Sequence, residues 1–214
     1  MKETIICFCA HSDDQIFGPG GTLAKYAQEG MRIMTVIFSY GQLTHLHLKE
    51  EIIIETRINE SLKANEIIRG NQVLFFGLSE GRFLAEAKEK RIYSKIRKLL
   101  QVYKPVKIFT HSPDDPHPDH RAVHEVMTTV VDTMHYSGSV YAFDIWNPFN
   151  WRKRTEPKLY VDISETFKTK IKALMVFESQ KIALYTLLWS VYVRAILHGI
   201  QHGCRFAERF YKIR

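Results

Sequence analysis

Short apolar segments alternate with amphipathic ones along most of the chain, and this alternation limits the possible folds more than any other feature. Residues 4–10 (TIICFCA), 32–38 (RIMTVIF) and 106–110 (VKIFT) are nearly continuous apolar runs, whereas 22–29 (TLAKYAQE) has the spacing of an amphipathic helix closed by Gly30. Strands that are apolar along their whole length are typical of parallel sheets covered by helices on both faces. The pattern therefore predicts a Rossmann-like three-layer α/β/α fold with a mostly parallel sheet.

The alternation continues to the end of the sequence. It predicts further helices at 49–69, 87–103, 121–134, 164–180 and 183–210, and further strands at 73–76, 139–145 and 158–163. A chain of 214 residues is long enough to bury one sizeable core and too short for two ordinary domains. No internal repeat or long linker interrupts it, so we expect residues 1–214 to form a single domain.

The turn after the first strand, CAHSDDQIFGPGGT (9–22), combines glycines with a histidine and two aspartates. A dinucleotide-binding turn requires G-x-G-x-x-G and an acidic residue at the end of the second strand. Here Leu23 stands at the third glycine position, and the second strand ends in Ser39 and Tyr40. Both requirements fail, and the imidazole and carboxylate groups of the turn instead suit a divalent metal such as zinc.

A second polar cluster, HSPDDPHPDH (111–120), follows the apolar run at 106–110. In the common doubly wound sheets, the first strand and the first strand after the reversal lie side by side, and ligands bind beyond their carboxyl ends. If the runs at 4–10 and 106–110 are these two strands, the two polar clusters lie together at the carboxyl edge of the sheet. The alternative is two unrelated loops that cap helices, but the density of His and Asp favours a metal site.

At these residues the sequence resembles the PIG-L/LmbE-like family of zinc-dependent N-acetylglucosaminyl deacetylases. The family signature Ala-His-Pro-Asp-Asp-Glu, followed by Gly-Gly-Thr, is similar to residues 10–15 and 20–22, and the second signature, His-Pro-Asp-His, is intact at 117–120. Weaker similarity extends through 56–70, 172–180 and 203–210. Ser12 replaces the signature proline and Gln15 its glutamate; we expect less local rigidity and altered hydrogen bonding, with the metal ligands unchanged.

The resemblance implies a catalytic metal centre. Its ion is Zn²⁺, or another divalent transition metal, and the implied ligands are His11, Asp14 and His120. Three protein ligands and an open position are the arrangement of a catalytic zinc, which lowers the pKa of water to about 7. Because adjacent residues diverge, Asp13 cannot easily share the ion with Asp14, and the resemblance assigns Asp13 as the general base.

Three more residues receive roles from the resemblance. His117 is implied to stabilise the oxyanion and protonate the departing amine, with Asp119 fixing its tautomer and keeping it charged. Arg57 is implied to contact the substrate. An ordinary ion pair with Glu60, three positions later on a helix surface, is an equally simple explanation of that arginine.

The activity implied is hydrolysis of the N-acetyl group from a GlcNAc-containing small molecule or glycoconjugate. An alternative keeps the chemistry and changes the acyl amide. A further alternative is a non-catalytic protein that binds nucleic acid or anionic surfaces through its net charge of +7. Aromatic and basic residues mix only in 146–157, a loop that could instead border a sugar pocket through Trp146, Trp151 and Arg152. We therefore expect an N-acetylated amino-sugar substrate and no nucleic-acid partner.

The cysteines and the hydropathy of the sequence indicate where the protein is located in the cell and whether it forms oligomers. Three cysteines without C-x-x-C spacing, and no recognisable signal peptide, predict a cytoplasmic protein. The apolar stretch 183–200 is interrupted by Arg194 and His198, short of the about 20 apolar residues that a membrane span needs. We expect a core helix or an oligomer-facing helix there, and a homo-oligomer, a trimer or hexamer as similar proteins form.

Overall fold

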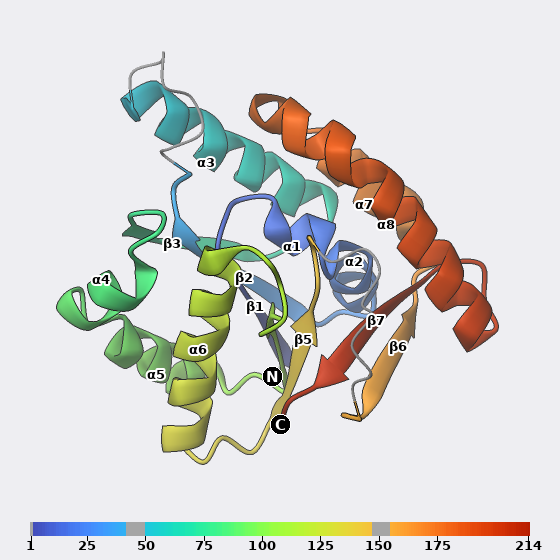
Figure 1. Ribbon diagram of the computed structural model, residues 1–214. Coiled ribbons are helices and arrows are strands. Elements are labelled where there is room, and N and C mark those ends of the chain that lie inside the picture. The colour runs from blue at the N-terminus through green and yellow to red at the C-terminus, as the bar shows by residue number, and fades with distance from the viewer. Residues whose placement is uncertain (1, 42–49, 147–154) are drawn as a thin grey trace.

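Seven strands form one sheet in the computed structural model, which describes residues 2–41, 50–146 and 155–214 (Figure 1). The strands are β1 (Thr4–Cys9), β2 (Arg32–Ser39), β3 (Gln72–Leu78), β4 (Lys107–His111), β5 (Ser139–Phe143), β6 (Lys158–Asp162) and β7 (Ala207–Lys212). Their order is β3-β2-β1-β4-β5-β7-β6; β1 to β5 run parallel, and β7 is antiparallel to both of its neighbours. The predicted mostly parallel sheet is confirmed, with β1 and β4 side by side at the reversal.

Helices cover both faces of the sheet, which makes the three predicted layers (Figure 1). On one face lie α1 (Asp14–Phe17), α2 (Gly20–Gln28), α3 (Glu50–Ile67), α7 (Phe167–Leu174) and α8 (Lys181–His202). On the other lie α4 (Phe83–Glu89), α5 (Ile92–Tyr103) and α6 (Pro118–Thr133). Side chains of a strand alternate between faces, so Ile5 and Cys7 join the first core while Ile6 and Phe8 join the second.

Three predicted helices are wrong in their extent. The segment 87–103 belongs to α4 and α5, which are separated at Arg91 in the left-handed conformation (φ 55°). The predicted helix 164–180 is α7 followed by a short 3₁₀ helix, Glu178–Gln180. The predicted helix 183–210 ends at His202, because Gly203 takes a left-handed conformation (φ 77°), and the residues after it form β7.

The outer face of α8 is partly apolar. Its exposed side chains include Ile182, Tyr185, Trp189, Ile196 and Ile200. Among the residues that the structure describes, no helix combines the length and apolarity required to cross a membrane. Self-association through this face stays a prediction, as do the single domain and the cytoplasmic location.

A buried ion pair holds the glycine-rich turn between α1 and α2. The Glu208 carboxylate, on β7, accepts hydrogen bonds from the backbone N–H groups of Gly21 (3.0 Å) and Thr22 (2.8 Å). Lys170 Nζ, on α7, donates to Glu208 Oε1 at 2.6 Å and to two carbonyl oxygens at the end of α1 at 2.8 and 2.9 Å. A helix N-terminus of this kind binds phosphate in nucleotide-binding turns, and here the protein's own carboxylate occupies it.

Candidate active site

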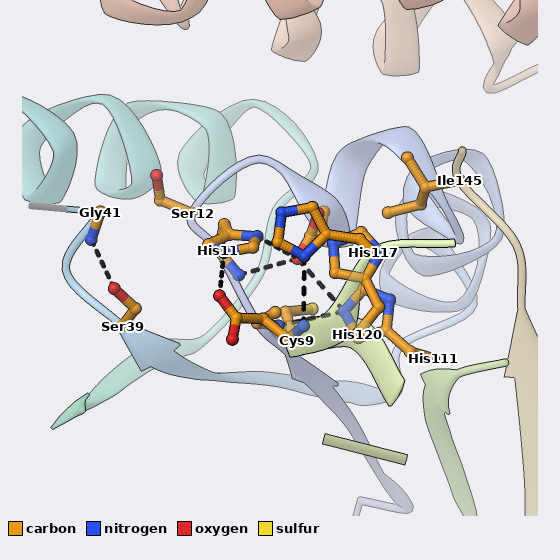
Figure 2. A network of polar contacts seen from close by, with 12 residues as sticks. Cys9, His11, Ser12, Ser39, Gly41, His111, His117, His120 and Ile145 are labelled. Atoms are coloured by element: carbon orange, nitrogen blue, oxygen red, sulfur yellow. Dashed lines mark hydrogen bonds and ion pairs between the residues drawn. The ribbon is translucent and has the colours of Figure 1, made fainter. Parts of the chain in front are cut away.

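The two polar clusters lie together at the carboxyl ends of β1 and β4 (Figure 2). One nitrogen or oxygen atom from each of His11, Asp14 and His120 lies within 4.8 Å of the other two. His11 Nδ1 is 3.5 Å from Asp14 Oδ2, and His120 Nε2 is 3.3 Å from Asp14 Oδ1. The parallel sheet thus brings together the three residues predicted as metal ligands, although His120 is more than 100 positions from the other two in the chain.

The two aspartates after β1 have different environments. The Asp14 carboxylate turns back and accepts a hydrogen bond from the backbone N–H of His11 at 2.7 Å. Asp13 stands at the N-cap of α1, but its carboxylate makes no capping hydrogen bond and lines a cavity instead. Burial, together with the nearby Asp14 carboxylate, raises the pKa of Asp13 above its usual range. A carboxylate with a raised pKa is the better proton acceptor.

The HPDH tetrad forms the beginning of α6. His117 is the N-cap, Pro118 is the first helical residue, and the backbone N–H of Asp119 donates to His117 Nδ1 at 3.2 Å. Proline is favoured at this first position because its missing N–H would have no partner within the helix. The helix therefore starts three residues before the predicted 121. One turn in, His120 is fully buried and faces Asp14.

The contacts of His117 and Asp119 differ from the predicted pairing of these two side chains. Asp119 Oδ1 accepts from the backbone N–H of Gly81 at 2.8 Å, and Oδ2 lies 3.4 Å from His11 Nε2. Because His117 Nδ1 accepts a hydrogen bond, the proton of the neutral ring resides on Nε2. Burial and the neighbouring histidines lower the pKa of His117. The prediction that Asp119 keeps His117 charged is therefore wrong in this geometry, in which the ring is a neutral donor.

Asp115 joins several parts of the site, although it was not among the predicted metal ligands. It is completely buried, and its Oδ1 accepts from the backbone N–H of His117 and faces His120 Nδ1, both at 3.0 Å. Its Oδ2 accepts from the backbone N–H groups of Ile145 (3.1 Å) and Trp146 (3.3 Å), after β5. His111 is buried beside it, 3.1 Å from Asp14. The only signal for either residue was its place in the HSPDD segment.

The electrostatics of the cluster favour a bound cation. Although burial opposes the charge, Asp119 and Asp14 raise the pKa of His11 to about 10, and Asp14 and Asp115 raise that of His120 to about 9. His120 Nε2 is buried and faces the Asp14 carboxylate at 3.3 Å, outside hydrogen-bond geometry. A divalent ion would satisfy the same carboxylates by displacing these protons. The donor set of two imidazoles and one carboxylate suits zinc and other first-row transition metals.

Arg57 is part of the site, not of the surface. It is 2% exposed, and its Nε donates to Ser12 Oγ at 2.9 Å. The Glu60 carboxylate instead accepts from the backbone N–H (2.8 Å) and hydroxyl (2.6 Å) of Ser179. The alternative of a helix-surface ion pair is therefore wrong. Gln15 Nε2 donates to the Ser12 carbonyl at 2.8 Å, so the two departures from the family signature lie in one network.

A cavity of about 410 Å³ opens above the cluster. The residues that line it include His11, Asp13, Asp14, Phe17, Arg57, Glu80, His117, Asp119, Trp146 and Leu187. Trp146 thus lies at the cavity as predicted, whereas Trp151 and Arg152 fall outside the described residues. Six of the seven predicted site residues line this one space, and the seventh, His120, is fully buried against Asp14.

Comparison with known proteins identifies the family. Residues 6–131, more than half of the chain, match the family described as PIG-L, GlcNAc-PI de-N-acetylase. The chain belongs to the PIG-L family. The resemblance expected from the two sequence signatures is thereby confirmed.

The proteins whose sequences are similar to this chain differ in activity. A diacetylchitobiose deacetylase of Thermococcus kodakarensis is 26% identical over 222 residues, covering 96% of this chain and 81% of the relative. A 4-oxalmesaconate hydratase of Pseudomonas putida is 24% identical over 225 residues, covering 94% and 81%. The structure of an N,N'-diacetylchitobiose deacetylase from Pyrococcus horikoshii has a TM-score of 0.79 at 21% identity, covering 99% of this chain and 84% of that one. The last comparison supports the fold alone.

Proposed function

We propose that this PIG-L family member is a metal-dependent hydrolase that removes the N-acetyl group from a GlcNAc-containing molecule. The observation that carries the proposal is the position of Asp13, which lines the cavity next to the group formed by His11, Asp14 and His120. A carboxylate beside a cation site, but outside its donor set, is placed to act as general base in metal-assisted hydrolysis of an amide. The deacetylase relative, which matches 96% of this chain, supports this reaction over other hydrolyses.

His11, Asp14 and His120 would hold the metal. A bound divalent ion lowers the pKa of water to about 7 and polarises a carbonyl group. Asp115 would fix the ring of His120 through Nδ1, so that Nε2 faces the ion. Zinc, or another divalent transition metal, fits this donor set.

The cavity residues would then perform the proton transfers. Asp13 accepts the proton of the attacking water, whose oxygen adds to the acetamide carbon. His117, neutral and protonated on Nε2, donates a hydrogen bond to the carbonyl oxygen as negative charge develops there. The C–N bond breaks when the nitrogen takes up the proton from Asp13, and acetate and a free amine leave. Asp13 thus takes the place of His117, the amine's proton donor by resemblance, because the Nε2 proton of His117 is held by the carbonyl oxygen.

A hydratase is the competing function, because one relative carries that activity. Its name indicates a substrate with several carboxylates, which cationic side chains would have to neutralise. A divalent ion would be offset in part by Asp14, and the other carboxylates among the described residues that line the cavity, Asp13, Glu80 and Asp119, outnumber the single guanidinium of Arg57. This charge balance favours a neutral sugar over a polyanion.

The proposed function predicts metal-dependent acetate release. We expect the purified protein, loaded with Zn²⁺, to release acetate from N-acetylglucosamine or N,N'-diacetylchitobiose, and to stop after chelation. His135→Asn is the control, since this histidine is exposed and has a left-handed backbone (φ 47°) that asparagine tolerates. Acetate release only from non-sugar N-acetyl amides would assign the same chemistry to another acyl amide. Hydration of an unsaturated polycarboxylate without acetate release would contradict the proposal.

Asp115→Asn should weaken metal binding by about 10- to 100-fold, the usual cost of losing a carboxylate that orients a histidine ligand. Asparagine has one acceptor oxygen where Asp115 uses two, and its NH₂ group would face N–H donors. Competition with a chromogenic chelator measures the affinity. Asp114→Asn makes the same change at the adjacent residue and should bind as the wild type does; equal affinities in both variants would show that Asp115 does not orient His120.

A further inference from the structure

Ser12 occupies a position where its side chain and its main chain make separate contacts with α3. It is fully buried, and its hydroxyl accepts a hydrogen bond from Arg57 Nε at 2.9 Å. Its carbonyl oxygen accepts from the hydroxyl of Ser61 at 3.1 Å. Arg57 and Ser61 are one helical turn apart, so both project from the same face of α3 towards the turn that carries Asp13 and Asp14.

The guanidinium of Arg57 is confined from a second side by Gly41. A Cβ atom at Gly41 would lie 2.3 Å from Arg57 Nε and 2.6 Å from Cζ, so no other residue fits there without displacing the arginine. Gly41 itself has φ 79° and donates its N–H to Ser39 Oγ at 2.8 Å, and both residues are labelled in Figure 2. The guanidinium is therefore held between the end of β2 and Ser12.

This confinement decides where the positive charge lies in the cavity. Arg57 lines the cavity beside Asp13, the residue proposed to accept the proton of water. A hydrogen bond at Nε fixes the plane of a guanidinium, because the group is rigid and planar and presents its remaining N–H groups as a fork. A residue without a side-chain acceptor at position 12, such as the proline of the family signature, cannot supply this bond.

We infer that Ser12 is a positioning residue for Arg57, and that through it Arg57 is directed at an oxygen-rich group next to the scissile acetamide, such as a sugar hydroxyl. The substrate named in this inference rests on the proposed function. The contact between Ser12 and Arg57 does not depend on that function. Loss of the Ser12 hydroxyl should weaken ground-state binding of the substrate more than it slows the chemical step.

Ser12→Ala tests the inference, with Ser61→Ala as the matched control. Both variants remove one buried hydroxyl from the same junction, but only Ser12→Ala removes the acceptor of Arg57 Nε. The first measurement needs no substrate: hydrogen exchange of the Arg57 Nε–H resonance by NMR, assigned with Arg57→Lys. We expect exchange at least about 10-fold faster in Ser12→Ala and unchanged in Ser61→Ala. Unchanged exchange in Ser12→Ala would overturn the inference.

The second measurement is the kinetics of acetate release from N-acetylglucosamine by the zinc-loaded protein. We expect KM to rise about 10-fold in Ser12→Ala, in the range for a lost hydrogen bond to a charged group, with kcat within about twofold and an unchanged zinc content. Equal changes of KM in both serine variants, or no change in either, would overturn the positioning role. A wild type that hydrolyses no N-acetylated sugar would overturn the proposed function, while the exchange measurement would still decide the contact.

Discussion

Asp13→Asn should reduce kcat by about 10³-fold while the metal content stays at the wild-type level. The effect is within the usual 10²- to 10⁴-fold contribution of a general base. Asparagine has nearly the same shape as aspartate but cannot accept a proton at neutral pH. The three candidate ligands form their group without Asp13, so the ion has no reason to leave. Metal analysis and acetate release on the same preparation measure both parts of the prediction.

Asp14→Asn provides the contrast, because the same chemical change is made at the adjacent residue. Asp14 lies within ion-pair distance of His11 and His120, and its pKa is held well below the usual range by the nearby histidines in spite of burial. We expect this variant to lose the metal and the activity together. If Asp13→Asn lost the metal as well, or kept its full rate, Asp13 would not be the general base.

The parts of the fold that follow local patterns could be predicted from the sequence. Apolar runs such as 4–10 and 106–110 identify strands because a strand covered on both faces needs apolar residues at successive positions. The polar clusters identify the site because the carboxyl ends of neighbouring parallel strands share one edge. Hence the sequence correctly predicted that His11, Asp14 and His120 lie close together, although nothing in it gives the distances between them.

The parts that depend on distant partners could not be predicted. The helix predicted at 183–210 includes the first residues of β7, and only pairing with β5 and β6 makes Ala207–Lys212 a strand. The pairing of Arg57 with Ser12 required the packing of α3 on the turn after β1. For the same reason nothing in the sequence separates the buried Lys170 of α7 from the exposed Lys172.

Lys170→Met should destabilise the protein by about 3–5 kcal/mol, the usual cost of removing one partner of a buried ion pair. Methionine fills a similar volume but leaves the buried Glu208 carboxylate without its cation. It also removes the donor to the two carbonyl oxygens at the end of α1. The free energy of unfolding from urea or guanidinium titration measures the loss, and Lys172→Met, the same change at an exposed position two residues away, should be close to neutral.

The double variant Lys170→Met/Glu208→Gln separates the two contributions to this loss. If the unpaired carboxylate causes most of it, neutralising Glu208 should recover part of the stability, so that the double variant is more stable than Lys170→Met alone. The amide oxygen of glutamine can still accept a hydrogen bond from Gly21 or Thr22 at the start of α2. A loss below about 1 kcal/mol in Lys170→Met would show that the pair does not hold the turn. A double variant less stable than Lys170→Met would mean that Glu208 stabilises the turn through its hydrogen bonds to Gly21 and Thr22, and not through its charge.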